Sequence, residues 1–269
     1  MTQLAQYQCP LCSSALIKNE NSFQCEHNHS FDIAKEGYVN LLPVQQKKSL
    51  QPGDDKNMVL ARRAFLQQGY YEFLRSALVD EISQLAPANV VDLGCGEGYY
   101  TDELQRVTSC LTYGIDISKS AVKYAAKRNK QVNYAVATNA HLPFGDQSIQ
   151  VIANVFAPLV GEECQRILTK DGVIVSVAPG PNHLIELKQK IYQTPQLHDV
   201  PKPPAGFNTQ SSKVVSKQVQ LDNPNDIENL LTMTPFGWKI SPQAKSELLA
   251  NLPFSIQLDF VISQYVREL

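Results

Sequence analysis

Short apolar runs alternate with amphipathic stretches through the middle of the chain, and this pattern predicts an α/β fold. Strands are expected near residues 89–94, 111–117, 133–138, 149–155 and 172–178. The stretches between these runs are long enough to hold a helix each, which favours right-handed crossovers between parallel strands. We therefore expect a doubly wound, Rossmann-like sheet that is covered on both faces.

The flanking segments predict further elements on either side of this core. Apolar residues recur at helical spacing over residues 57–86, and Gly69 divides them into two helices. A helix is expected from His183 to Tyr192, followed by an irregular excursion over residues 193–213, which are rich in Pro, Gly, Ser and Asn. Residues 214–221 and 254–266 alternate like strands, with helical segments between them, and should add an antiparallel edge to the sheet.

Composition limits what the protein can be. The chain has 269 residues and is 43% hydrophobic, enough for one α/β domain and a small appendage. The net charge of -2 implies that any nucleic-acid contact uses a local basic patch. No run is long enough to cross a bilayer, and the N-terminus does not resemble a targeting peptide, so a cytoplasmic location is expected.

Two basic clusters are candidates for such a patch. The run from Lys119 to Lys130 has helical spacing and fits a solvated helix face. The other cluster leads into the predicted sheet and is diluted by two acidic residues, Asp54 and Asp55. Its basic members are Lys47, Lys48, Lys56, Arg62 and Arg63.

The N-terminal cysteines predict a metal site. Cys9, Cys12, Cys25 and His29 have the spacing C-x2-C-x12-C-x3-H, in which two short ligand pairs supply the four donors of a tetrahedral zinc. His27 is the alternative fourth ligand. A site with three thiolates and one imidazole is usually closed and structural, and such a small unit needs the metal to fold. Four unrelated reduced side chains are the simpler alternative.

The segment VVDLGCGEG, residues 90–98, predicts a ligand site. A buried strand ends at Asp92, and Gly94, Gly96 and Gly98 form a turn that backbone and ligand can approach closely before a helix begins. Asp116 ends the next strand, where a carboxylate can accept hydrogen bonds from ribose hydroxyls. The alternative is a glycine turn that only joins strand to helix, with Asp116 capping a helix beside Ser118.

The glycine spacing resembles motif I of the class I S-adenosylmethionine-dependent methyltransferases. The pattern is G-x-G-x-G rather than the dinucleotide G-x-G-x-x-G. Glu97 at the start of the helix would repel a pyrophosphate but not a sulfonium. The segment from Leu142 to Ser148 also matches the family's L-P-F-x-D-x-S pattern. Two positions depart from the family: Thr138 or Asn139 would have to contact the adenine amine, and Gln150 replaces a common Asp.

A more specific resemblance covers nearly the whole chain. The zinc cluster and the segments FDIAKEGYVNLLPVQQKK, DDKNMVLARRAFLQQGYY, VDLGCGEGYYT, APGPNHLIELK and TMTPFGW are similar to the bacterial 23S ribosomal RNA guanine-N1 methyltransferases. The chain looks most like the class I branch, which modifies the helix 35 hairpin. The resemblance implies a zinc-binding RNA-recognition module over residues 1–42, a linker with helices over 43–88, and a methyltransferase domain over 89–269.

The resemblance also implies roles for particular residues. Tyr71 and His183 would join Asp92, Glu97, the three glycines and Asp116 in the S-adenosylmethionine pocket. Without the resemblance, the favoured interpretation of Tyr71 is a packing tyrosine, and that of His183 is a residue that opens a helix. The partner would be a 23S ribosomal RNA hairpin, gripped by the zinc module and residues 47–63, and the enzyme would be a homodimer.

Methylation of N1 needs a straight alignment of the methyl group with the acceptor nitrogen, and a group that takes the N1 proton. Phe156, Ala157 and Pro158 are the expected contacts to the flat base. The catalytic residue itself is not identified by the sequence. Two other functions remain open: a methyltransferase for a small molecule, and a non-catalytic zinc-bearing RNA-binding protein.

Overall fold

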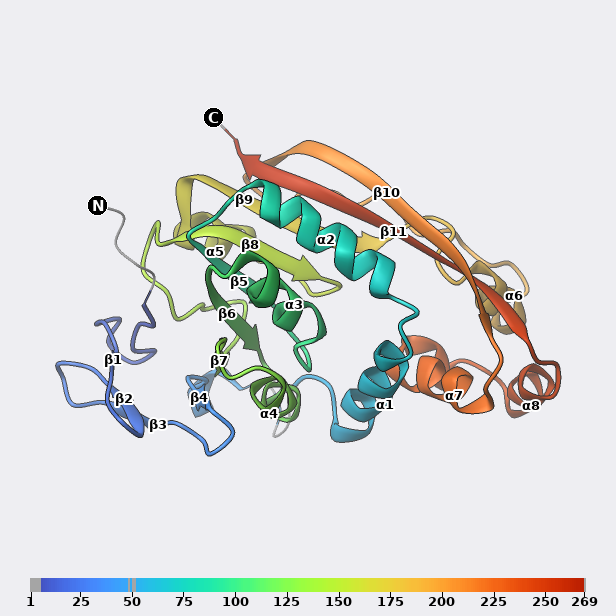
Figure 1. The fold of residues 1–269 in the computed structure, drawn as a ribbon, viewed down its shortest axis with the longest axis horizontal. Helices are drawn as coiled ribbons and strands as arrows, with labels where there is room; N and C mark the ends of the chain where they lie inside the picture. Colours follow the sequence, from blue (N-terminus) through green and yellow to red (C-terminus); the bar gives the residue numbers. More distant parts are fainter. Residues whose placement is uncertain (1–5, 48, 50–51, 269) are drawn as a thin grey trace.

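The computed structural model describes residues 6–47, 49 and 52–268. A three-stranded N-terminal sheet lies beside a much larger eight-stranded sheet, and the connection between them runs along the lower edge in Figure 1. The small sheet comprises β1 (Ile17–Lys18), β2 (Ser22–Gln24) and β3 (Ser30–Asp32). Its strands pair antiparallel in sequence order.

The large sheet has the order β10-β11-β9-β8-β5-β6-β7-β4. All neighbours pair in parallel except β11, which runs antiparallel to both β9 and β10. The doubly wound α/β fold with an antiparallel strand near one edge is therefore confirmed. The strands are β4 (Tyr38–Asn40), β5 (Asn89–Leu93), β6 (Leu111–Asp116), β7 (Asn133–Val136), β8 (Ile149–Val155), β9 (Leu168–Pro179), β10 (Phe207–Leu221) and β11 (Phe254–Arg267).

Two parts of this sheet were not predicted. The prediction of an irregular segment up to residue 213 is wrong, because β10 begins at Phe207 and pairs with β11 along its length. Most side chains of β10 are exposed, so no alternation of apolar and polar residues marks its first half. β4 was also missed, because a strand of three residues is too short to show any period.

Helices cover both faces of the large sheet, and each face has its own apolar core. Val90 packs with α2 and α3, whereas the next residue, Val91, packs with α5 on the opposite face. Both faces are buried, which explains why the strands read as continuous apolar runs. The helices are α1 (Lys56–Gln67), α2 (Glu72–Gln84), α3 (Tyr99–Thr108), α4 (Lys119–Arg128), α5 (Gly161–Ile167), α6 (Ile185–Ile191), α7 (Pro224–Met233) and α8 (Pro242–Ala250), with 3-10 turns η1 (Val44–Gln46) and η2 (Pro235–Trp238).

Gly69 separates α1 from α2 as expected, and its backbone φ is +83°. The turn glycine Gly53 has a similar φ of +81°. The Asp55 side chain caps α1 by accepting hydrogen bonds from the amides of Asn57 and Met58, at 2.7 and 2.9 Å. α1 packs against α7, which belongs to the insertion between β10 and β11. The helices that precede the sheet and the insertion near its end thus meet at the carboxyl ends of the parallel strands.

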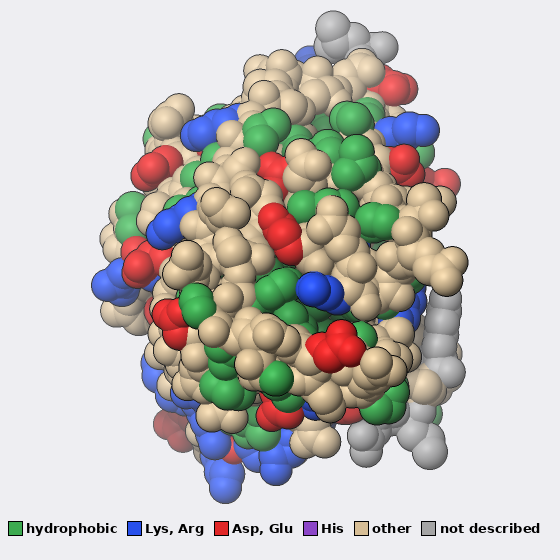
Figure 2. Space-filling model, turned by 90° about the vertical axis from the view of Figure 1, so that its right-hand side faces the viewer, with side chains coloured by type: hydrophobic (Ala, Val, Ile, Leu, Met, Phe, Trp, Pro, Cys, Tyr) green, Lys and Arg blue, Asp and Glu red, His purple; other side chains and the backbone are tan. Residues whose placement is uncertain are grey.

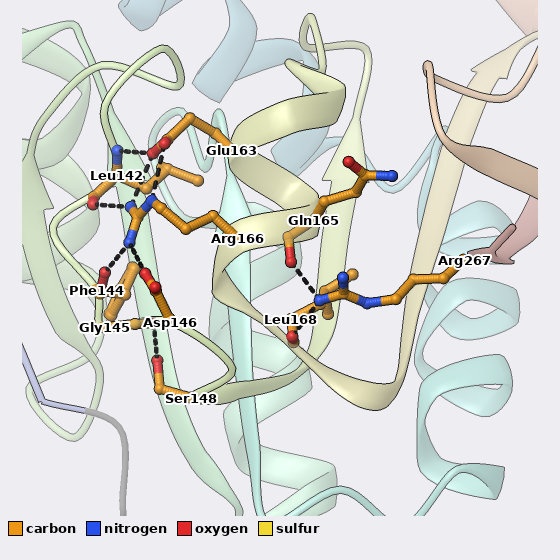
Figure 3. A network of polar contacts seen from close by, with 10 residues as sticks. All are labelled: Leu142, Phe144, Gly145, Asp146, Ser148, Glu163, Gln165, Arg166, Leu168 and Arg267. Carbon is orange, nitrogen blue, oxygen red and sulfur yellow. Dashed lines mark hydrogen bonds and ion pairs between the residues drawn. The ribbon is translucent and has the colours of Figure 1, made fainter. Parts of the chain in front are cut away.

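Arg166 of α5 fixes the L-P-F-x-D-x-S segment to the sheet (Figure 3). Its guanidinium donates to the carbonyls of Phe144 and Leu142, at 2.6 and 2.8 Å, and pairs with Glu163 and Asp146. The Glu163 carboxylate in turn accepts from the Leu142 amide at 2.7 Å. The segment from Leu142 to Ser148 therefore has a structural role, and it lies between the main sheet and the N-terminal module.

Within the described parts of the chain, none of the helices has the length and apolar character needed to span a membrane.

Candidate cofactor pocket and metal centre

The structure brings the four predicted metal ligands together. The ligand atoms of Cys9, Cys12, Cys25 and His29 all lie within 4.8 Å of one another. His29 Nδ1 lies 3.4 Å from the sulfurs of both Cys9 and Cys25, and the Cys12 and Cys25 sulfurs are 3.7 Å apart. A tetrahedral zinc with Zn–S of ~2.3 Å and Zn–N of ~2.0 Å requires edges of about 3.5–3.8 Å. The donor set and its spacing therefore fit Zn²⁺.

Local turns position these ligands. In the first, the Ser13 amide donates to the Cys9 carbonyl at 2.8 Å, and in the second the Asn28 amide donates to the Cys25 carbonyl at 2.9 Å. Ser13 and Asn28 both have positive φ, near +61° and +62°, which turns the chain sharply around the cluster. His27 lies outside the cluster, where its Nδ1 is 3.3 Å from the Ser14 hydroxyl. His29 is thus the fourth member, as expected.

Two cavities that share a wall lie at the carboxyl ends of the parallel strands. The smaller, of about 240 Å³, is lined by the glycine loop and by the ends of β6 and β8. The larger, of about 880 Å³, is lined by α1, by residues 179–198 and by residues 233–239. Arg62, Leu66, Tyr100 and Phe156 line both. Ligands collect at this edge of open α/β sheets, where adjacent strands lead away in opposite directions.

The glycine loop is held in a conformation that suits close approach by a ligand. Gly94 and Gly96 have φ of +78° and +55°. A Cβ on Gly94 would lie 2.3 Å from the Ala157 side chain, so only glycine fits there. A Cβ on Gly96 would meet nothing within 4 Å, so it would project into open space. That open space adjoins the smaller cavity, which Gly94 and Gly96 both line.

Asp116 joins the glycine loop to the end of β6. One carboxylate oxygen accepts from the Gly96 amide at 2.9 Å, and the other accepts from the Ser118 amide at 2.7 Å. The cap of α4 is the Ser118 hydroxyl, which accepts from the Ala121 amide. Asp116 therefore orders both loops without itself capping α4, and its carboxylate, which lines the cavity, can accept further hydrogen bonds.

Four side chains in the wall of the smaller cavity have a buried polar atom that lacks a hydrogen-bond partner among the described residues. They are Asp92, Glu97, Tyr99 and Tyr100. Buried polar atoms are nearly always paired, so a group of orphans around one cavity indicates a polar ligand. Asp54, Asp92, Glu97 and Asp116 line this cavity together with a single cation, Arg62. This charge distribution suits a cationic nucleoside such as S-adenosylmethionine and opposes a polyphosphate.

The ionisation of Asp92 reflects its burial. Its Oδ2 accepts from the Thr101 hydroxyl at 2.6 Å, while Oδ1 is unpaired within the described chain. Burial raises the pKa of Asp92 to about 7, although the Thr101 hydroxyl acts in the opposite direction. Burial likewise raises the pKa of Glu97, against the influence of Arg128, which forms an ion pair with it. Both carboxyl groups would gain from a cationic partner.

Arg62 occupies a different place from the one expected for an RNA-binding residue. It forms an ion pair with Asp54, donates to the Met233 carbonyl at 3.3 Å, and lines both cavities. Arg63 lies over the ring of Tyr124, 5.5 Å from its centroid. Lys47 and Lys56 are exposed, and Lys48 lies outside the described residues. Arg62 therefore contributes to the cavity wall, a position that no motif in the sequence indicates.

Tyr71 and His183 line the larger cavity, with ring centroids 6.5 Å apart. Burial, aided by His198 and Lys188, lowers the pKa of His183 to about 3, so the imidazole is neutral. His183 Nδ1 accepts from the Asp259 amide at 3.3 Å, which places its remaining proton on Nε2. His198, which sequence reasoning missed, lies beside it, and its buried Nε2 has no partner in the described chain.

Phe156 borders every cavity at this edge of the sheet. It follows β8, has a φ of +58°, and remains 47% exposed. A bulky residue in the left-handed region is uncommon and is often found at a functional site. Ala157 and Pro158 line the smaller cavity next to it. Thr138 and Asn139 line neither cavity, and the Asn139 amide donates instead to the Pro158 carbonyl at 3.0 Å.

Comparison with known proteins agrees with this geometry. Residues 7–50 match a zinc-ribbon family model described as "RlmA, N-terminal", and residues 90–172 match a model described as "Methyltransferase domain". The chain is 30% identical to the 23S rRNA (guanine(748)-N(1))-methyltransferase of Streptomyces fradiae, covering 91% of this chain and 90% of that protein. It is 32% identical, over 70% of each chain, to a Micromonospora griseorubida protein provisionally named for the same guanine-N1 activity.

The chain belongs to the 23S rRNA guanine-N1-methyltransferase family. It is accordingly an S-adenosylmethionine-dependent enzyme with an N-terminal zinc ribbon. A likeness to the demethylmenaquinone methyltransferase of Thermotoga maritima, at 30% identity, extends over only 44% of this chain. This likeness is thus confined to less than half of the present chain.

Replacement of the two neighbouring histidines should separate the metal ligand from its neighbour. We expect His29→Ala to lose bound zinc and His27→Ala to keep it, because only His29 lies within the cluster. Mutation of a residue that only hydrogen-bonds to a ligand lowers metal affinity by about 10- to 100-fold. Loss of the ligand itself should therefore lower the affinity by more than this. Zinc content of the purified variants is the measurement, and equal zinc in both would show the assignment to be wrong.

The ionisation of Asp92 predicts a pH dependence of cofactor binding. With a pKa of about 7, Asp92 is protonated at lower pH and then no longer attracts the cationic cofactor. Affinity for S-adenosylmethionine should weaken as the pH falls from about 7.5 to about 6, by up to about tenfold per pH unit.

Calorimetry over this pH range tests the prediction in three proteins. Asp92→Asn should bind more weakly and lose the pH dependence, whereas Asp80→Asn, at an exposed position of α2, should behave like the native enzyme. The same slope in the Asp92 variant would mean that another group titrates.

Proposed function

We propose that this enzyme transfers the methyl group of S-adenosylmethionine to N1 of a guanine in the helix 35 hairpin of 23S ribosomal RNA, as in the class I branch of the family. The observation that carries the proposal is the pair of joined cavities at the carboxyl ends of the strands. One has the orphaned acidic groups that a cationic nucleoside needs, and the other has room for a base. The zinc ribbon on the same chain favours RNA over a small acceptor.

The smaller cavity would hold the nucleoside end of the cofactor. Asp116 offers lone pairs to the ribose hydroxyls, and Gly94, Gly96 and Gly98 allow close approach of the backbone. A volume of about 240 Å³ is below the ~300–1,000 Å³ typical of small-ligand sites. The methionine end would therefore extend along the shared wall, past Asp92 and Glu97, toward Tyr71 and His183 in the larger cavity.

The rest of the larger cavity would receive the target guanine. A base in a hairpin must leave its stack before an enzyme can reach N1. Phe156 offers an exposed aromatic face at the boundary between the two cavities, where acceptor and donor would meet. Stacking on this ring would orient the base edge-on toward the donor. Alignment of this kind can lower the activation barrier by roughly several kcal/mol.

When bound, S-adenosylmethionine supplies an electrophilic methyl group on a positively charged sulfur. The protein must in turn accept the proton that guanine carries on N1. His198 suits this role, because its unpaired Nε2 lies in the wall of the larger cavity. Burial and Lys188 lower the pKa of His198, against Asp199 and Asp259, so the ring is neutral near pH 7 and can accept a proton.

The N-terminal module and residues 47–63 would grip the RNA, with Lys47 and Lys56 as exposed phosphate contacts. Arg62 is omitted from this group, since it lines the cavities. A homodimer, which the family resemblance implies, and a cytoplasmic location, which a ribosomal RNA substrate implies, complete the proposal. Light scattering on the purified protein tests the dimer.

The function is tested by incubating the enzyme with labelled methyl donor and 23S ribosomal RNA that lacks the modification. Methylation at N1 blocks pairing, so reverse transcriptase should stop next to the modified guanine. The position of the stop distinguishes the class I target from neighbouring guanines of the hairpin. Label on a small metabolite and none on RNA would favour the small-molecule alternative, and no transfer at all would favour a non-catalytic RNA-binding protein.

His198→Gln should lower kcat by about 100-fold or more, because the N1 proton must then leave without a base. The residual rate should rise with pH as the guanine itself ionises, whereas the native rate should fall only when His198 becomes protonated, below its lowered pKa. Cofactor affinity should not change. His27→Gln, in the zinc ribbon, is the matched control. A native kcat and pH profile in the His198 variant would exclude this base.

A further inference from the structure

Trp238 is exposed on a turn whose neighbouring residues Phe236 and Lys239 line the larger cavity. It is the only tryptophan of the chain, and its side chain is 83% exposed. It ends η2, whose first residues Pro235 and Phe236 line the cavity together with the following residue, Lys239. Leu197, another lining residue, is 58% exposed. Single exposed apolar residues are ordinary, but a large aromatic ring beside a substrate cavity suggests a contact.

The turn that carries this ring has an ordered backbone. Gly237 packs so closely on α7 that a Cβ there would lie 2.6 Å from the Leu231 carbonyl oxygen. The amides of Lys239 and Ile240 both donate to the Phe236 carbonyl at 3.0 Å, and the Thr234 hydroxyl donates to the Leu230 carbonyl at 2.8 Å. Trp238 is therefore presented on an ordered turn anchored to α7, so little backbone freedom would be lost on binding.

The chemistry around the ring favours an unpaired nucleobase. Figure 2 shows the side of the molecule that carries α6, α7 and α8, where acidic and basic side chains are interspersed with hydrophobic ones. Such a face has no single-sign field that would hold phosphates by charge alone. Lys239 adds one cation, which lies 5.7 Å from the centroid of the Tyr192 ring in the cavity wall. Lys245 is paired with Glu228. With little net charge available to bind phosphates, stacking of a base on the Trp238 ring is the interaction that this surface offers.

We propose that Trp238 stacks on an unpaired base that flanks the target guanine, and so holds the RNA strand at the mouth of the cavity. This inference rests on the proposed function and extends it to a second contact with the RNA, in the insertion between β10 and β11. A ring at the rim binds the neighbour of the target and leaves the cavity free for the guanine. Lys239 then lies where it can reach the phosphate between the two nucleotides.

Fluorescence of the native enzyme gives a direct test, because tryptophan emission reports on this position alone. Excitation at a wavelength that tyrosine does not absorb should show saturable quenching when the unmodified RNA hairpin is added, in the presence of S-adenosylhomocysteine. A duplex RNA without unpaired bases should quench much less. Saturable hairpin binding in a filter assay without any change in emission would overturn the proposal.

Kinetics of two variants provide the second test. Trp238→Ala should raise KM for the hairpin by about 5- to 150-fold, the range that corresponds to ~1–3 kcal/mol per stacked base, with kcat and cofactor affinity unchanged. Trp238→Phe should recover part of the loss, because it keeps an aromatic face. Val214→Ala, which removes an exposed apolar side chain from β10, is the control and should leave KM unchanged.

The outcomes separate this inference from the proposed function. If RNA is methylated but Trp238→Ala has a native KM, the stacking contact is wrong and the function stands. If the native enzyme neither binds nor methylates RNA, the proposed function fails, and this contact with it. If Trp238→Ala instead changes the mass of the enzyme in light scattering, the ring is covered by a second copy of the chain and the proposal is wrong.

Discussion

The hydrogen bond between the Gly96 amide and the Asp116 carboxylate is the contact on which the cofactor pocket depends. It joins the loop after β5 to the end of β6. The Ser118 amide donates a hydrogen bond to the other oxygen of the same carboxylate. The positive φ of Gly96 favours glycine there, and a side chain at this position would project into the space beside the cavity. Asp92 near the end of β5 and Glu97 in the loop that follows each have an unpaired buried oxygen beside this contact. One carboxylate thus both shapes the loop and leaves lone pairs at its wall.

Sequence reasoning succeeded where burial imposes a periodic pattern. β5, β6 and β8 are buried on both faces, so their apolar runs were visible, and the turn glycines mark where the strands end. It failed at the start of β10, an edge strand whose exposed side chains carry no such pattern although its backbone pairs with β11 on one side. The zinc ligands were found because metal geometry fixes their spacing, whereas Arg62 and His198 were assigned no such role because only the tertiary fold brings them to the cavities.

The larger cavity, where we propose that the base binds, shows why the acceptor site is the harder part to predict. The cofactor side is made of loops that directly follow strands, where position along the chain implies position in space. The acceptor side is assembled from α1, the irregular residues 193–198 and η2, which meet only through the packing of α1 on α7. These segments share no period and no motif. Substrate specificity in such a fold resides in the insertions, and the pocket for the common cofactor resides in the sheet.

The zinc ribbon is coupled to the catalytic domain through packing rather than through the cavities. Tyr7 donates to the Asn133 carbonyl at 2.9 Å, and its ring contacts Tyr113 and Phe144 on the main sheet. Cys9 and Cys25 belong to the same buried cluster as Phe144, the residue whose carbonyl Arg166 holds. Zinc can contribute on the order of 10 kcal/mol to the folding of so small a unit. Because the zinc ligands and Phe144 share one buried cluster, a metal that stabilises the ribbon also supports its packing against the main sheet.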